Sequence, residues 1–258
     1  MSRALPLTIV DAFAHAPFTG NPAAVITLDT WPHDAVMQAI AAQNNLPATA
    51  FAMSQGPDYD LRWFSPTAEL SLCGHATLAA GHVLIGNRDA VRFRTKAAGD
   101  LIVEQDGEAL ALTLPDWKAT PRALPGIAAG MGGAVVESLW HDSGYAVLVY
   151  PDAAAIRALV PDFLTLAPLG NILIIATAPG DDTDIISRAF LPHGDMEDPV
   201  TGSAHCVIAA YWAQRLGRGT FTAYQASTRG GYLGVRYTQG SVILTGRCRT
   251  VLRGEFLF

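Results

Sequence analysis

Charged residues are scarce in this sequence. Asp, Glu, Lys and Arg make up 16% of its 258 residues, against roughly 25% in an average soluble domain. Half of the residues are hydrophobic, and the 24 Gly and 16 Pro are scattered along the chain. This composition excludes a disordered chain, a collagen-like repeat and a coiled coil. It favours a turn-rich globular protein with a substantial core, built as one large domain or two smaller ones.

Basic residues are fewer than acidic ones. Seventeen Lys and Arg against 23 Asp and Glu give a net charge of −6. No run of basic residues with interleaved aromatic residues occurs anywhere in the sequence. We therefore expect no nucleic-acid partner, because phosphate backbones are bound by such basic surfaces.

Cysteines and long hydrophobic runs are also few. The three cysteines, Cys73, Cys206 and Cys248, cannot all pair, and no stretch before Asp11 resembles a signal peptide. A reducing cytoplasm is therefore the expected location. The longest uncharged run, residues 163–180, is interrupted by Pro and Gly, whereas a membrane helix needs about 20 mostly apolar residues. We expect no association with a membrane.

Short β-rich runs bounded by turn residues recur along the chain, and helical patterns are fewer. The expected strands are residues 7–13, 23–28, 61–64, 91–94, 101–103, 109–114, 135–140, 145–150, 172–176, 185–190, 242–244 and 250–252. The expected helices are residues 32–44 with Thr30 as the N-cap, a helix after Gly74, residues 152–159 and residues 203–216. This mixture predicts an α+β fold.

Two of the expected helices carry no charged residue. His75–Ile85 and Ser203–Gln214 contain no Asp, Glu, Lys or Arg. A helix that is apolar on all sides must be buried on all sides. Each is therefore expected at the centre of a barrel-like, mostly antiparallel sheet, which gives the chain two cores.

The segments that lead into these two helices resemble each other. Phe64–Ala76 and Phe190–Ala204 each contain Phe-x-Pro, then a Glu five residues before a Gly, then Gly-x-Ala at the helix start. The two glycines, Gly74 and Gly202, lie about half the chain length apart, as an internal duplication would give. Coincidence in a Gly- and Ala-rich sequence is the alternative.

A duplication predicts two pseudo-symmetric lobes. We place them at residues 1–118 and 119–258, with the terminal strand 247–258 as a candidate to return to the first lobe. If the lobes face each other, the N-termini of both central helices point into one cleft. Unpaired N–H groups and positive dipole ends favour an anion there. A small carboxylate-bearing molecule is the expected ligand, and proton transfer beside its carboxylate the expected reaction.

Three side chains beside the helix starts are candidates for this chemistry, and each has a plainer interpretation. Cys73 is either a base with a lowered pKa or a small core residue. His75 either carries a proton or binds the backbone. Asp198 is an acid or base, a helix cap, or both. Glu69 and Glu197 occupy matched positions in the two expected lobes. A carboxylate that is repeated in this way is better interpreted as bracing a loop than as a catalytic group.

Other catalytic motifs are missing from the sequence. It contains no Gly-rich phosphate loop, no dinucleotide fingerprint, no His-Glu-x-x-His and no Cys-x-x-Cys. Ser203 does not lie in a Gly-x-Ser-x-Gly elbow. We therefore expect no metal, no cofactor and no serine-hydrolase chemistry.

Several motifs resemble those of the PhzF-like (phenazine-biosynthesis-like) family, within the diaminopimelate-epimerase-like superfamily. They are Asp11–Val25 with its Gly-Asn-Pro core, Phe64–His75, Glu197–His205 and Gln225–Gly231, so the resemblance runs nearly end to end. It implies two pseudo-symmetric lobes with the active site between them, frequently a homodimer. It also implies cofactor-independent isomerase or epimerase chemistry, exemplified by isomerisation of a dihydro-hydroxyanthranilate.

The resemblance also assigns roles to residues. In the family a Glu shuttles the proton while a His and an Asp assist, and His75 and Asp198 match those two. The N–H groups of Gly74, Gly202 and Ser203 would form the anion cradle. Two further residues of the matching motifs are expected to bind substrate, Asn21 and Thr201.

The shuttling Glu itself has no match. The family's Asn-Leu-Ser-Glu-Thr-x-Phe corresponds here to Asn45–Phe51, which places Ala48 at the Glu position. One alternative is a different base, and Cys73 is attractive because diaminopimelate epimerases have a catalytic Cys in a similar context. Their second catalytic Cys has no equivalent, since Pro199 lies near its place.

Two further alternatives concern the reaction itself. Either the reaction differs and needs only Asp198 and His75, or catalysis is lost and the protein binds a small acid. The leading hypothesis is a cytoplasmic, cofactor-free isomerase that acts on a small carboxylate-bearing metabolite. A binding module without turnover is the competing hypothesis.

Overall fold

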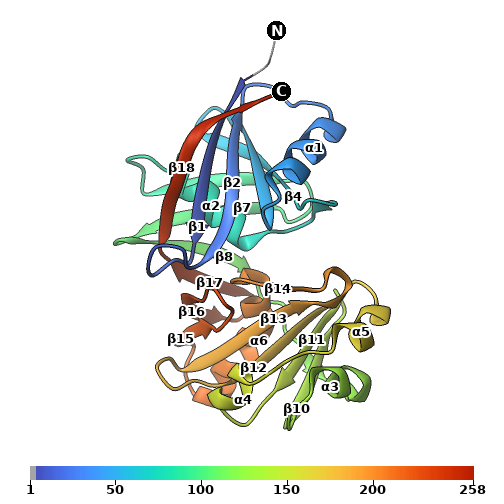
Figure 1. Cartoon of the computed structure of the whole chain (residues 1–258). Helices are drawn as coiled ribbons and strands as arrows, with labels where there is room; N and C mark the ends of the chain where they lie inside the picture. The colour runs from blue at the N-terminus through green and yellow to red at the C-terminus, as the bar shows by residue number, and fades with distance from the viewer. Residues whose placement is uncertain (1–3) are drawn as a thin grey trace. The chain divides into compact units, whose positions relative to one another are not determined.

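The computed structural model describes residues 4–258, and they form two compact units. The first unit runs to Leu114 and includes Thr245–Phe258, and the second spans Pro115–Leu244. The lobe boundary expected from the sequence was residue 118. Both ends of the chain belong to the first unit, where the C-terminal strand lies beside the N-terminal one (Figure 1). No helix within residues 4–258 is long and apolar enough to cross a membrane.

The first unit is a mixed sheet with two helices. Its elements are β1 (Ala4–Ala12), β2 (Asn21–Leu28), α1 (Asp34–Asn44), β3 (Ala48–Gln55), β4 (Asp58–Phe64), β5 (Glu69–Leu70), α2 (Gly74–Leu84), β6 (Ala90–Thr95), β7 (Asp100–Asp106), β8 (Ala109–Pro115) and β18 (Cys248–Leu257). β1 pairs antiparallel with both β18 and β2, and β2 pairs parallel with β3. β4 pairs antiparallel with β3 and β5 and parallel with β6, and β6, β7 and β8 continue antiparallel.

The second unit carries more short helices. Its elements are β9 (Thr120–Pro121), α3 (Pro125–Met131), β10 (Glu137–His141), β11 (Tyr145–Val149), α4 (Ala153–Arg157), α5 (Phe163–Leu166), η1 (Ala167–Leu169), β12 (Leu173–Pro179), β13 (Ile185–Leu191), η2 (Pro192–Gly194), β14 (Met196–Asp198), α6 (Gly202–Leu216), β15 (Thr220–Gln225), β16 (Gly231–Thr238) and β17 (Ser241–Gly246).

The strand pairings of the second unit repeat those of the first. β10–β11 is antiparallel like β1–β2, and β11–β12 is parallel like β2–β3. β13 pairs antiparallel with β12 and β14 and parallel with β15, as β4 does with β3, β5 and β6. The two units therefore share one topology, in which α2 and α6 occupy the same place.

The two helices that contain the uncharged segments, α2 and α6, are the most buried helices of their units. Every residue of α2 from Gly74 to Gly81 is buried, and α2 packs against β1, β2, β3 and β7. In α6, burial extends over most positions from Gly202 to Ala213, and this helix packs against β11 and β16. The expected α+β fold with a central helix in each sheet is confirmed, because apolar helices need cover on all sides.

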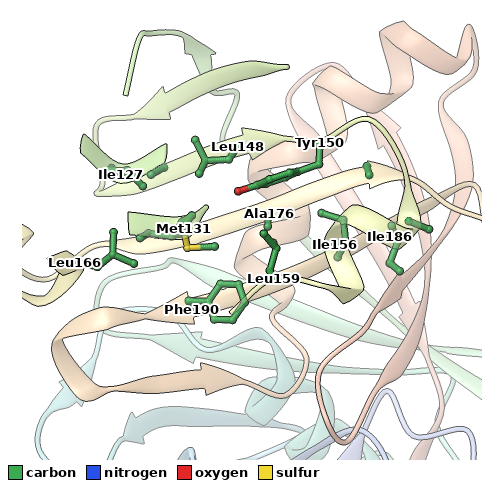
Figure 2. Close-up of a cluster of buried hydrophobic side chains, with 14 residues drawn as sticks. Ile127, Met131, Leu148, Tyr150, Ile156, Leu159, Leu166, Ala176, Ile186 and Phe190 are labelled. Carbon is green, nitrogen blue, oxygen red and sulfur yellow. The ribbon is translucent and has the colours of Figure 1, made fainter. Parts of the chain in front are cut away.

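The outer face of each sheet is covered by the other helices. In the first unit, Met37 and Ile40 of α1 pack onto Ile26, Phe51 and Phe64. In the second unit, α3, α4 and α5 supply side chains that pack onto Leu148, Ala176, Ile186 and Phe190, as Figure 2 shows. Alternate strand residues point to opposite faces of a sheet. One face of each sheet packs on its central helix and part of the other packs on these outer helices, whereas the outward residues of β6 and β7 are exposed.

Two expectations about local structure are wrong or incomplete. Thr30 is not the N-cap of α1, because the helix begins at Asp34 and its N-cap is His33, which makes no side-chain capping bond. Pro32 disfavours helical backbone at the residue before it, so the chain stays extended until His33. The sequence also does not predict β3, whose Ala-rich start has low strand propensity. It forms a strand because it is buried between β2 and β4.

Several further strands are absent from the expectations, and β15 and β16 are the longest of them. They pair antiparallel with each other over Thr220–Gln225 and Gly231–Thr238. Glycines within and beside these segments weaken their strand pattern in the sequence. β15 is fixed instead by its parallel pairing with β13.

Candidate functional site

His75 lies in the first turn of α2 and is buried. Its Nδ1 is 3.3 Å from Nδ2 of Asn21, the first residue of β2. An amide nitrogen can only donate, so Nδ1 accepts and the ring proton sits on Nε2. Burial lowers the pKa of His75 to about 3, because the charged ring would lose its hydration. His75 is therefore neutral at physiological pH, with an acceptor on one side of the ring and a donor on the other.

The thiol of Cys73 lies beside the same imidazole. Cys73 is the N-cap residue of α2 and has an extended backbone. Its Sγ is 3.6 Å from Nδ1 and 4.0 Å from Nε2 of His75. Its carbonyl oxygen accepts a hydrogen bond from the hydroxyl of Thr77 at 2.7 Å, which fixes the residue at the helix start. The structure thus brings Asn21, Cys73 and His75 together.

Ala48, at the position of the family's Glu, is fully buried. It is the first residue of β3 and pairs in parallel register with Ala23 of β2, two residues beyond Asn21. A Glu side chain at position 48 would therefore project from β3, the strand next to the one that carries Asn21. A methyl group there carries no proton.

Asp198, the last residue of β14, is held by Thr201 and Gln225. The hydroxyl of Thr201 donates to Oδ2 of Asp198. The side chain of Gln225 donates through Nε2 to the Asp198 carbonyl at 2.8 Å and to the Thr201 hydroxyl at 3.0 Å. Its Oε1 accepts from the Thr201 backbone N–H at 2.8 Å. Because Gln225 donates to the Thr201 oxygen, the Thr201 hydrogen is directed to the Asp198 carboxylate.

The segment after Gln225 braces the same loop. Ser227 donates to the carbonyl oxygen of Pro199 at 2.7 Å and accepts from the N–H of Gly230 at 3.1 Å. Gly230 has φ +65°, and a Cβ there would lie 2.3 Å from the Tyr224 hydroxyl, so only glycine fits. Sequence reasoning assigned Gln225 and Ser227 no role, although their motif was visible. The structure makes them the support of the Asp198 loop.

The two central helices begin in the same way. Neither Cys73 nor Thr201, their N-cap residues, makes a side-chain capping bond. The N–H groups of the first turn, including those of Gly74 in α2 and of Gly202 and Ser203 in α6, therefore have no cap and suit an anion. His205 contacts the Thr201 carbonyl oxygen through Nδ1 at 2.8 Å. This contact corresponds to the hydrogen bond from Thr77 to the Cys73 carbonyl oxygen in the first unit.

Glu69 and Glu197 are structural, as the sequence predicts. Glu69 forms a two-bond ion pair with Arg62, at 2.7 Å and 2.9 Å. Glu197 forms the same pair with Arg188, also at 2.7 Å and 2.9 Å. In each unit the Glu stands opposite a Phe in the sheet register, and the Arg lies over that Phe ring. Both carboxylates therefore hold the short strand that leads towards the helix start.

The other two cysteines have no such surroundings. Burial raises the pKa of Cys206 far above its usual value and that of Cys248 to about 12, so both thiols stay protonated. Within residues 4–258 no group of three or more His, Cys, Asp and Glu side chains is arranged for a metal ion. Each unit carries a candidate group of its own, around His75 in the first unit and around Asp198 in the second.

Comparison with known proteins gives consistent matches. Residues 10–254 match the PhzC-PhzF family, described as phenazine biosynthesis-like protein. An uncharacterized isomerase of Pseudomonas aeruginosa is 44% identical, over 97% of this chain and 98% of its own length. A PhzF-family crystal structure from Enterococcus faecalis has a TM-score of 0.92 at 39% identity, covering 98% of this chain and 99% of that one.

A more distant match concerns the fold alone. A hydroxyproline epimerase from Agrobacterium vitis, crystallised with bound trans-4-hydroxy-L-proline, has a TM-score of 0.64 at 10% identity. It covers 99% of this chain and 93% of that one. At this identity the match shows a shared fold alone.

Proposed function

The chain belongs to the PhzC-PhzF phenazine biosynthesis-like family, and from this premise we propose that it is a cofactor-independent isomerase or epimerase. Its relatives include proteins named as isomerases. The proposed reaction moves a proton on a small carboxylate-bearing metabolite. The observation that carries the proposal is the environment of Asp198, a buried carboxylate oriented by Thr201 and Gln225.

We assign the proton-transfer roles to three side chains. Asp198 accepts or donates a proton on one side of the substrate. Cys73 replaces the family's Glu as the base of the first unit, and its Sγ lies 3.6 Å from Nδ1 of His75. The Nε2–H group of His75 then donates a hydrogen bond to the enolate-like charge that forms.

Backbone groups would hold the substrate's carboxylate. The N–H groups of Gly74, Gly202 and Ser203 stand at helix starts without side-chain caps. Helix dipoles favour an anion at these positions, so an overall charge of −6 does not oppose the binding of an acid. In this proposal Asn21 and Thr201 act by positioning His75 and Asp198.

Three further expectations, an internal duplication, a cytoplasmic location and a homodimer, join this proposal. The repeated strand pairings support an internal duplication. The protein works in the cytoplasm as a homodimer.

Deuterium exchange tests the proposed activity. The protein is incubated in deuterated water with a panel of amino and hydroxy acids, and loss of carbon-bound protons is followed by NMR. We expect exchange on at least one acid, and its loss in Asp198→Asn. Asp195→Asn is the control, since Asp195 is exposed and lies outside the Thr201 network. Exchange that persists in Asp198→Asn contradicts the role of Asp198.

A binding module without turnover is the alternative, favoured by the methyl group at Ala48. Tight binding of an acid without exchange across the panel would support the module and contradict the isomerase. The role of Cys73 is checked separately by its alkylation rate across pH. A rate profile like that of an ordinary thiol would make Cys73 a packing residue.

A further inference from the structure

The last strand of the chain presents a long edge. β18 pairs with β1 from Ala4–Leu257 to Ala12–Cys248, and among the described residues its contacts with other strands are sparse at most. An uncovered edge offers a row of backbone N–H and C=O groups to another strand. β18 is ten residues long, whereas proteins usually shorten or protect such edges.

Apolar side chains are exposed along this edge. Leu252 is 47% exposed and Leu257 is 63% exposed, although residues of this kind are normally buried. Every residue from Val251 to Glu255 is exposed. Phe256 is the exception, because it packs against the cluster beneath α1. The strand therefore has apolar area that the first unit does not bury.

The sequence of β18 is self-complementary about Gly254. If two copies pair antiparallel with Gly254 opposite its own copy, Arg253 faces the partner's Glu255, and Leu252 faces the partner's Phe256. Two ion pairs and two apolar pairs form across the two-fold axis, and such cross-strand pairs stabilise a sheet. A shift in either direction places Arg253 opposite its own copy, or Glu255 opposite its own copy, and like charges oppose pairing.

From the uncovered edge and this complementarity, we propose that β18 is the dimer interface of the protein. Two copies join antiparallel through residues 252–256, so that the sheets of both first units become continuous across a two-fold axis. The register shift between β1 and β18 falls between Ile9 and Val10, where Val251 is skipped. This bulge at Val251 marks the N-terminal end of the stretch, residues 252–256, that pairs between the two copies. The strand and its register go beyond the homodimer that the family resemblance implies.

Charge reversal tests the register. We expect the wild type to sediment as a dimer, and Arg253→Glu or Glu255→Arg to raise the dimer Kd about tenfold or more, since each variant creates two like-charge pairs. The double variant Arg253→Glu with Glu255→Arg restores the pairs and should recover the wild-type Kd. Arg236→Glu on β16, also an exposed strand position, is the matched control.

A disulfide trap tests the same register independently of charge. Gly254→Cys should cross-link two copies under mild oxidation, because directly opposite residues have Cα atoms about 4.5–5.5 Å apart, within disulfide range. The position tolerates a side chain, since only the end of Leu252 lies within 4 Å of an added Cβ, at 3.9 Å. Leu252→Cys is the control, because its two copies would stand about 13 Å apart along the strands.

The outcomes decide the proposal. A monomeric wild type overturns it. A dimer that survives both charge reversals, or that Gly254→Cys does not cross-link, shows an interface elsewhere and also overturns it. Dissociation by each single variant, recovery in the double variant and cross-linking at Gly254→Cys alone support it.

Discussion

The side-chain amide of Asn21 donates to Nδ1 of His75 across 3.3 Å. This contact fixes the tautomer of a buried ring whose pKa lies at about 3. The ring nitrogen of His75 that carries the proton is thus set by a side chain from β2, outside the helix of His75. Asn21 belongs to the Gly-Asn-Pro motif, which gives that motif a physical role.

Replacing Asn21 by Asp should reverse this arrangement. A carboxylate accepts instead of donating, so the ring proton should move to Nδ1, and the negative charge should raise the pKa of His75. Nitrogen-detected or two-bond proton–nitrogen spectra of the imidazole report both changes. In the wild type we expect a neutral ring protonated at Nε2 from about pH 5 to about pH 8. A wild-type His75 that titrates near the ordinary value of about 6.5 would contradict the assigned environment.

Buried histidines should make the protein sensitive to acid. The pKa values of His75 and His205 are about 3 and about 4 in the folded state, below the ordinary value near 6.5. Between the folded-state pKa values and the ordinary value, the unfolded chain therefore binds more protons than the folded chain. The free energy of unfolding falls as pH drops below about 6.5. At pH 5 each histidine should lower the free energy of unfolding by on the order of 2 kcal/mol.

Denaturant unfolding at about pH 7.5 and about pH 5 measures this effect. His205→Asn should reduce the acid-induced loss by on the order of 2 kcal/mol, because the amide does not titrate. His193→Asn, at an exposed position, should leave the loss unchanged. Equal losses in His205→Asn and the wild type would show that His205 is not the linked group.

Removal of the Gln225 side-chain amide should weaken the Asp198 loop. Gln225→Leu leaves the Thr201 N–H and the Asp198 carbonyl without their partners, and each buried loss costs about 1–3 kcal/mol. The Thr201 hydroxyl also loses the donor that directs it to Asp198. We expect lower stability together with slower proton exchange on the substrate. Gln214→Leu, on the exposed side of α6, is the control and should change neither quantity.

The two Arg–Glu braces should contribute similar stability. Arg62→Met and Arg188→Met each leave a partly buried Glu without its two-bond partner. We expect a loss of about 2–3 kcal/mol in each case, since charge-assisted pairs of this burial exceed exposed ones. Arg157→Met removes an exposed pair with Asp181 and should cost less than about 1 kcal/mol. Thermal unfolding compares all three variants directly.

Restoring the family's carboxylate should raise activity on a family-type substrate. Ala48→Glu places a carboxylate where the resemblance expects the shuttling base. Ala48 is fully buried, so the larger side chain should lower the melting temperature. Ala48→Gln has the same size without a titratable group, and it should lower stability without any gain in exchange. A folded Ala48→Glu variant with no gain over Ala48→Gln would count against a lost ancestral base.

Local signals in the sequence were sufficient for several features. The absence of charge in two helices predicted that both lie inside sheets, because burial on all sides tolerates no unpaired charge. The matched Glu positions before Gly74 and Gly202 predicted two bracing carboxylates, and Arg62 and Arg188 supply their partners. The motifs also indicated the family, since they extend over most of the chain.

Tertiary structure decided the features that depend on distant residues. Ala-rich β3 is a strand only because β2 and β4 enclose it. The link from Gln225 to Asp198 joins residues whose separation in sequence hides their contact.

The sequence by itself determined which segments are apolar and which residues stand at the helix starts, and it has Ala48 where the family resemblance places a Glu. These are local properties of side-chain type and spacing. Only the folded chain determined that His75 is neutral and accepts from Asn21, and that Thr201 points its hydroxyl at Asp198. Protonation and hydrogen-bond direction depend on burial and on neighbours from other strands, which no local pattern encodes.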